Sequence, residues 1–69
     1  MNESINQVVD QIIAAYEGVE NVQLRFGYTE PMGVYNWRSR GVPKSLVADI
    51  HLDTGIPITR IQEGVKKVA

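Results

Sequence analysis

Side chains that donate hydrogen bonds or carry positive charge gather within residues 19–44 of this 69-residue chain. This stretch holds four basic residues against two acidic ones, whereas residues 1–18 hold three acidic residues and no basic one. Near its centre Asn36 carries a carboxamide, and Arg38 and Arg40 follow closely. A carboxamide can donate and accept hydrogen bonds side by side, and guanidinium groups bind anions. These residue types suit recognition of polar and anionic surfaces.

A second group of titratable residues, Asp49, His51 and Asp53, has the types that bind metals or exchange protons. On a helix the two aspartates are i, i+4 neighbours while His51 points elsewhere, so we interpret the aspartates as a solvent-exposed face and expect no metal. The absence of cysteine excludes disulfides and thiolate metal sites. No serine, histidine and acid set and no glycine-rich phosphate loop has a spacing typical of catalysis, so we expect neither an enzyme nor a cofactor.

The length of the chain is close to the lower limit for folding around a single core. We therefore expect one domain over residues 1–69, in which most apolar positions serve packing and no small-molecule site is evident. The first residues lack the basic and apolar regions of a signal peptide, and no apolar run is long enough to span a bilayer. We expect a cytoplasmic protein that does not contact membranes.

Five short helices are expected to position these residues, and the first covers residues 5–17. Ser4 and Gln7 have the spacing of a capping box at its start, and Gly18 is placed to end it. Its apolar residues recur every three or four positions: Ile5, Val8, Val9, Ile12, Ile13 and Tyr16. The opposite face has no basic residue, unlike a helix that lies on a membrane, so we interpret the apolar face as core.

Two short helices joined by a tight turn follow in residues 19–43. The first of them covers residues 19–26 and ends at Gly27, where a glycine can adopt the positive φ of a sharp turn. Thr29 is expected to cap the second, which has Pro31 in its first turn and ends near residue 40.

The second helix of this pair has an inner and an outer face. Val34 and Trp37, three residues apart, are expected to pack against the core. The outer face would carry Met32, Tyr35, Asn36 and Ser39. On the preceding helix the side chains expected to reach outward are Gln23 and Arg25.

Beyond the pair, Pro43 redirects the chain into a fourth helix over residues 43–54, which Gly55 is placed to end. A short fifth helix is expected from about Thr59, where a second capping-box spacing occurs. An edge strand over residues 55–61 is the weaker alternative. The expected fold class is all-α, a compact bundle of about five short helices.

The turn and the helix after it carry a family likeness. An apolar residue and glycine, a threonine, an apolar-x-x-Trp helix and a basic-Gly-apolar-Pro exit occur in order: Phe26-Gly27, Thr29, Val34 to Trp37, and RSRGVP over residues 38–43. This combination resembles the DNA-binding core of phage Cro and CI repressors and of Cro-like regulators of bacterial prophages. The likeness covers about residues 19–64 and implies a lambda repressor-like fold with a helix-turn-helix, in a bacterial cell. Val34 follows Gly27 by seven residues, one more than is usual, which leaves the base-reading register open by one.

The resemblance implies that the helix over residues 30–40 enters the major groove of DNA. There the Asn36 carboxamide can form a bidentate pair with adenine. The implied base contacts are Glu30, Met32, Tyr35, Asn36 and Ser39. The implied phosphate contacts are Gln23, Arg25, Thr29, Arg38, Arg40 and Lys44.

The resulting hypothesis is a small transcriptional repressor that binds double-stranded operator DNA. A homodimer on a palindromic site is expected, because one such domain makes too few contacts for tight specific binding; its surface would include Val65 and Val68. The chain can instead be the N-terminal domain of a CI-type repressor, or a Cro-like antitoxin. The rival from another class is a helical protein-interaction module with no DNA role, which the net charge of −1 favours slightly.

Overall fold

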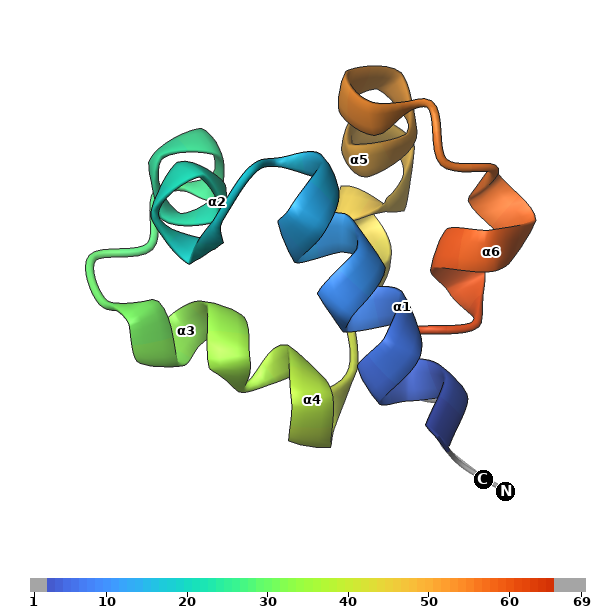
Figure 1. Cartoon of the computed structure of the whole chain (residues 1–69), viewed down its shortest axis with the longest axis horizontal. Helices are drawn as coiled ribbons and strands as arrows, with labels where there is room; N and C mark the ends of the chain where they lie inside the picture. Colours follow the sequence, from blue (N-terminus) through green and yellow to red (C-terminus); the bar gives the residue numbers. More distant parts are fainter. Residues whose placement is uncertain (1–2, 66–69) are drawn as a thin grey trace.

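The first helix lies across the middle of the molecule, and the other helices pack around it. The computed structural model describes residues 3–65, so Val68 of the expected dimer surface lies outside the described residues. The first helix, α1, spans Glu3–Ala15. In Figure 1 it has α2, α3 and α4 on one side and α5 and α6 on the other. Its apolar face is confirmed as core: Val8, Val9 and Ile12 are fully buried, and Ile5, Ile13 and Tyr16 pack against them.

Both ends of α1 differ from the prediction. The described part of the helix begins at Glu3, so the backbone of Ser4 already lies within it. At the other end Glu17, and not Gly18, adopts the left-handed conformation, with φ 67°. The Glu17 and Gly18 amides donate to Ala14 and Ile13 carbonyl oxygens, each at 3.0 Å. This bonding pattern is the Schellman arrangement, which places the left-handed residue one position before the predicted glycine.

The pair of helices expected next is present as α2 (Val19–Phe26) and α3 (Pro31–Tyr35). Gly27 ends α2 with φ 78°, as predicted, and its amide donates to the Gln23 carbonyl oxygen at 2.8 Å. The capping role predicted for Thr29 is wrong, because Glu30 is the residue in the extended conformation that directly precedes Pro31. The proline itself occupies the first turn, where no amide donor is needed.

The helix expected over residues 30–40 is divided at Asn36, so the single-helix prediction is wrong. A further helix, α4 (Trp37–Arg40), follows α3 after this one residue. Asn36 has φ −62° and ψ −18°, and its carbonyl oxygen accepts both the Ser39 amide at 3.1 Å and the Arg40 amide at 2.8 Å. The turn at Asn36 therefore combines a 3₁₀-type bond with an α-type bond, as is common where one helix ends and the next begins.

The predicted fourth helix is a 3₁₀ turn, η1 (Lys44–Leu46), continued by α5 (Val47–Thr54). Gly55 ends α5 with φ 78°, as predicted. The last helix, α6 (Ile58–Gln62), starts before Thr59, so the second capping box is also wrong. Within residues 3–65 there is no strand, and the edge-strand alternative is therefore wrong.

The core joins residues from every part of the described chain. Its buried members are Val8, Val9, Ile12, Val22, Val34, Trp37, Val42, Val47, Ile50, Ile56 and Ile61. A hydrogen bond of 2.8 Å from the Val42 amide to the Gly64 carbonyl oxygen ties the exit of α4 to the segment after α6. The all-helical bundle is thus confirmed. None of the helices within residues 3–65 is long and apolar enough to cross a membrane.

Candidate nucleic-acid interface

The outer face of α3 and α4 carries the side chains that the sequence places there. Val34 and Trp37 are buried, with 0% and 2% of their surface exposed, which confirms the inner face. On the other side Met32 and Tyr35 are 60% and 44% exposed. Ser39 is also exposed and Asn36 is half-buried. Met32 and Tyr35 lie three residues apart on α3, so their exposed side chains share one face of the helix.

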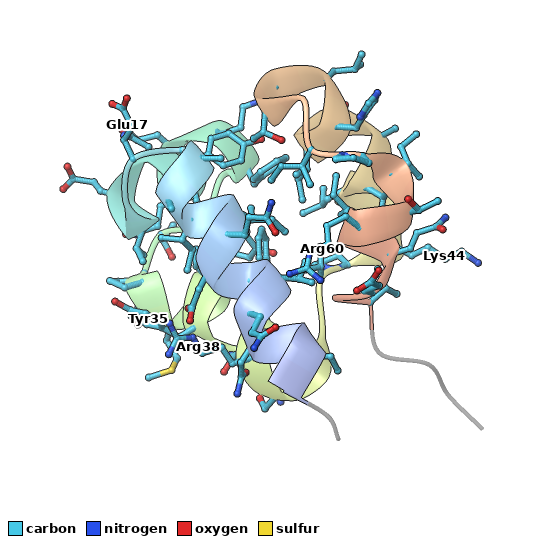
Figure 2. The ribbon with its side chains drawn as sticks, turned by 45° about the vertical axis from the view of Figure 1, so that its right-hand side comes forward. Glu17, Tyr35, Arg38, Lys44 and Arg60 are labelled. Carbon is cyan, nitrogen blue, oxygen red and sulfur yellow. The ribbon has the colours of Figure 1, made fainter. Side chains whose placement is uncertain are left out.

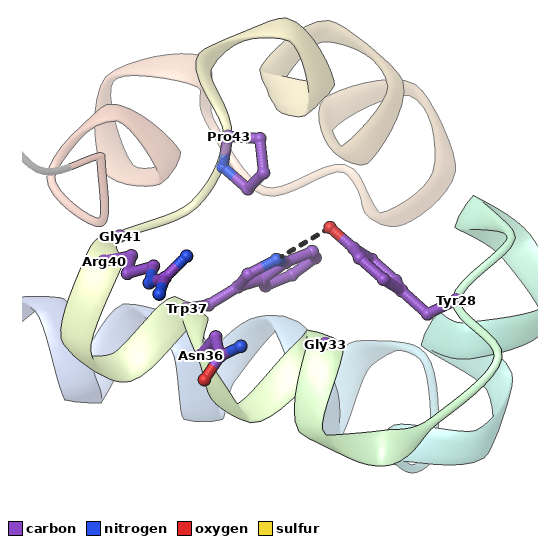
Figure 3. Close-up of a pocket in the computed structure, with 7 residues that line it drawn as sticks. All are labelled: Tyr28, Gly33, Asn36, Trp37, Arg40, Gly41 and Pro43. Carbon is purple, nitrogen blue, oxygen red and sulfur yellow. Dashed lines mark hydrogen bonds between the residues drawn. The ribbon is translucent and has the colours of Figure 1, made fainter.

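A shallow pocket of about 230 Å³ adjoins this face, between α3–α4 and the segment that leads into η1 (Figure 3). It is lined by Tyr28, Gly33, Asn36, Trp37, Arg40, Gly41 and Pro43. Within it the Trp37 indole nitrogen donates to the Tyr28 hydroxyl oxygen at 3.1 Å. The two rings meet edge to face, with centroids 6.1 Å apart. Trp37 is therefore a core residue whose polar edge lies at the surface of the pocket.

Tyr28 is the residue of this site that the sequence analysis missed. It belongs to no periodic pattern because it lies in the turn between α2 and α3. The available signal was Gly33, since an isolated glycine within a helix indicates a close approach by another group. A β-carbon added at Gly33 would lie 2.4 Å from Cδ1 of the Tyr28 ring. The ring thus packs directly on the helix backbone.

Two of the arginines expected to bind phosphate are engaged within the protein. Arg38 forms an ion pair with Asp10 of α1, and its guanidinium lies 5.8 Å from the centre of the Tyr35 ring (Figure 2). Both members of the ion pair are about half exposed. Since exposed pairs contribute about 1 kcal/mol or less, a phosphate can replace Asp10 at small cost.

Arg25 is held more firmly, in a network that joins α2 to α5. Its Nε donates to Asp53 at 2.7 Å, and its Nη2 lies 3.9 Å from Asp49. The Tyr16 hydroxyl donates to the same Asp53 oxygen at 2.5 Å. These bonds from Tyr16 and Arg25 lower the pKa of Asp53. Partial burial and the bond to Asp53 raise the pKa of Tyr16. The two aspartates are thus accessible to solvent, as interpreted from the sequence, but they also belong to a hydrogen-bond and ion-pair network that the sequence analysis did not predict.

The remaining basic side chains differ in whether they have a hydrogen-bond or ion-pair partner within the protein. Arg60 donates to Gln11 at 2.9 Å and to Glu63 at 2.8 Å. By contrast, neither Arg40 nor Lys44 has a hydrogen-bond or ion-pair partner among residues 3–65. Lys44 extends into solvent in Figure 2, and Arg40 lines the pocket in Figure 3. Unpaired positive charge thus lies where α4 leads into η1.

The other predicted contact residues lie around the turn. Glu30 and Thr29 are exposed, and Gln23 is half-buried near the end of α2.

Away from this region, the Nδ1 atom of His51 lies 2.8 Å from the Ile56 carbonyl oxygen, so this ring does not join Asp49 and Asp53. In the described residues no cluster of three or more histidine, aspartate or glutamate side chains can hold a metal ion.

The surface therefore combines an exposed face of mixed polarity with a pocket that holds polar donors and the unpaired Arg40. The unpaired Lys44 lies on a different side of the molecule (Figure 2). Comparison with protein-family models, with curated proteins and with solved structures finds no match to this chain.

Proposed function

We propose that this chain is a sequence-specific, double-stranded-DNA-binding transcriptional repressor of the phage Cro type. In this proposal α2, the turn over residues 27–30 and α3 form the helix-turn-helix, and the outer face of α3 and α4 enters the major groove. The observation that carries the proposal is the location of the unpaired Arg40. This residue is without a partner in the described part of the chain and lines the pocket beside that outer face, whereas Lys44, also without a partner there, extends from the side of the molecule away from Tyr35 and Arg38 in Figure 2.

Each part of this surface has a chemistry that matches duplex DNA. The exposed Met32 thioether and Tyr35 ring can contact thymine methyl groups and base edges. The Asn36 carboxamide, which has no hydrogen-bond partner among the described residues, can bond to an adenine edge or to a phosphate oxygen. Arg40 and Lys44 supply charge for phosphates, while Arg38 becomes available when a phosphate replaces Asp10.

The overall negative charge does not conflict with this proposal, because most acidic residues lie away from the outer face or are paired, and Glu30 at the start of α3 is the exception. Asp10, Asp53 and Glu63 each accept a hydrogen bond from an arginine. The local field at the outer face is therefore more positive than the net charge of −1 suggests. We further propose that two copies bind a palindromic site, because a single module of this size buries too little surface for tight specific binding.

The proposal is tested by selecting binding sites from a random duplex library with the full chain. The affinity for the selected duplex is then measured by fluorescence anisotropy between about 50 and 200 mM salt. We expect a palindromic consensus and an affinity that falls steeply with salt, because bound phosphates release counterions. Arg40→Gln and Lys44→Gln should each reduce the salt dependence by roughly one counterion per phosphate contact removed.

Arg60→Gln is the matched control, since it removes the same charge from a residue that is bonded to Gln11 and Glu63. It should leave the salt dependence unchanged. Equal effects of Arg60→Gln and Arg40→Gln would indicate a non-specific charge effect. An absence of duplex binding at the lowest salt would refute the proposal and favour a protein-interaction module. The length of the complete gene product and its gene neighbours distinguish a Cro-type repressor from a CI domain or an antitoxin.

A further inference from the structure

The pocket beside the outer face presents several hydrogen-bond donors and no carboxylate. Of its seven lining residues, Arg40 carries a positive charge, and Tyr28 and Asn36 carry polar groups. No aspartate or glutamate contributes to the lining. The wall between the donors is largely the ring of Trp37, with Gly33 and Pro43 on either side (Figure 3). A site of this composition favours a ligand that is anionic and accepts hydrogen bonds.

The donors are free to bind such a ligand. The Tyr28 hydroxyl oxygen accepts the Trp37 N–H, which leaves its own hydrogen available, and no acceptor for that hydrogen is found within residues 3–65. The Asn36 carboxamide and the Arg40 guanidinium likewise have no partner in the described part of the chain. Three unused donor groups therefore line one cavity of about 230 Å³.

The position of the Tyr28 hydroxyl is set before any ligand arrives. Its ring lies so close to the backbone at Gly33 that an added β-carbon would come within 2.4 Å of it. The edge-to-face contact with Trp37 and the 3.1 Å hydrogen bond orient the ring from the other side. Little conformational entropy is then lost when the hydroxyl donates to a ligand.

We propose that this pocket binds one phosphate of the DNA backbone, with Arg40 as the counter-charge and Tyr28 and Asn36 as neutral donors. The inference rests on the proposed DNA-binding function and adds Tyr28 to it. A phosphodiester offers only acceptor oxygens to the protein, which suits the Arg40 guanidinium, the Tyr28 hydroxyl and the amide group of Asn36. In this inference the Asn36 amide, which lines the same pocket, contacts the backbone in place of adenine, and base contacts come from Met32, Tyr35 and Ser39.

The experiment uses the full chain and the selected duplex, with single phosphates replaced by uncharged methylphosphonates. At one position in each half-site, the replacement should weaken binding by wild-type protein roughly tenfold, as expected for loss of a charge-assisted hydrogen bond. The same replacement should have little effect on a Tyr28→Phe/Arg40→Gln protein, because the contact is already absent. Tyr28→Phe alone should weaken binding without changing the salt dependence, since it removes no charge.

Trp37 is the only tryptophan of the chain, and its emission reports directly on the pocket. Its fluorescence should change on titration with duplex, and inorganic phosphate alone should produce the same change only at far higher concentration. A response to inorganic phosphate but not to duplex would identify a free-anion site and overturn the proposal. Arg60→Gln again serves as the control that removes charge outside the pocket.

Two further outcomes separate this inference from the function on which it rests. If wild-type protein binds the duplex but every methylphosphonate affects wild type and double variant equally, the pocket is not the phosphate site and the DNA-binding function stands. If wild-type protein binds no duplex, both fail together. Circular dichroism shows whether Tyr28→Phe remains folded. If it does not, Arg40→Gln and Arg40→Lys carry the same comparison, and equal methylphosphonate effects in those variants would refute the inference.

Discussion

Replacing Gly33 by alanine should destabilise this protein, although the same change normally strengthens a helix. Gly33 lies within α3, and its φ is not in the positive region, so alanine fits the backbone and should gain up to about 1 kcal/mol in helix propensity. The opposing effect comes from Tyr28. The new β-carbon would lie 2.4 Å from its Cδ1 and 3.0 Å from its Cγ, so the ring must move as a whole.

The expected size of the effect follows from what the moved ring loses. Forcing a methyl group into a packed contact costs about 1 to 3 kcal/mol. Displacing Tyr28 also removes the acceptor of the Trp37 indole N–H, whose side chain is only 2% exposed. Because the indole nitrogen lies at the surface of the pocket, water can replace the lost acceptor, and losing the hydrogen bond adds only about 1 kcal/mol. After subtraction of a propensity gain of about 1 kcal/mol, Gly33→Ala should lower the free energy of unfolding by about 1 to 3 kcal/mol.

Urea denaturation followed by circular dichroism measures this change, and a second background tests its cause. In a Tyr28→Ala protein the ring is absent, so Gly33→Ala should become neutral or stabilising by up to about 1 kcal/mol. The reversal of sign is the decisive result. If Gly33→Ala is as stable as wild type, or if it has the same effect in both backgrounds, the packing of Tyr28 on Gly33 does not control stability and the reasoning is refuted.

Two further predictions concern single features of the fold. Glu17 projects into solvent (Figure 2) and has φ 67°, a conformation that is strained for a residue with a β-carbon. Glu17→Gly should therefore raise the free energy of unfolding by about 1 kcal/mol, whereas the control Glu20→Gly within α2 should lower it. A lower stability of Glu17→Gly would contradict the claim that the backbone at Glu17 is strained. Because Tyr16 and Arg25 lower the pKa of Asp53 in the folded state, the stability difference between wild type and Asp53→Asn should be complete at neutral pH. It should shrink as pH falls below the ordinary value of 3.8 and through the lowered pKa, and a difference independent of pH would exclude this linkage.

Apolar periodicity allowed the core to be predicted well. Val8 and Ile12 of α1, and Val34 and Trp37 beyond the turn, are buried as their spacing requires, because a helix brings residues three and four apart to one face. Gly27 was predictable for a local reason too, since a positive φ at a helix end strongly favours glycine. Such features depend on a few neighbouring residues and can be identified from the sequence alone.

Capping and helix continuity were predicted less well. Ser4, Thr29 and Thr59 have suitable types and spacing, yet the helices begin at Glu3, Pro31 and Ile58. A cap contributes only about 1 kcal/mol, so packing of the whole helix can move its start by a residue or two. The break at Asn36 is a similar case, because nothing in the local pattern excludes a continuous helix there.

The sequence by itself determined an all-helical chain with a buried face on each main helix, a glycine turn and an outer face around Tyr35. Only the tertiary structure decided which charges are available at that face. Arg25 and Arg38 are each bonded to an aspartate 28 positions away, whereas Arg40 is unpaired beside the Tyr28 hydroxyl. Helical periodicity depends on local geometry and can be predicted from spacing. The pairing of distant charges depends on how the helices pack together.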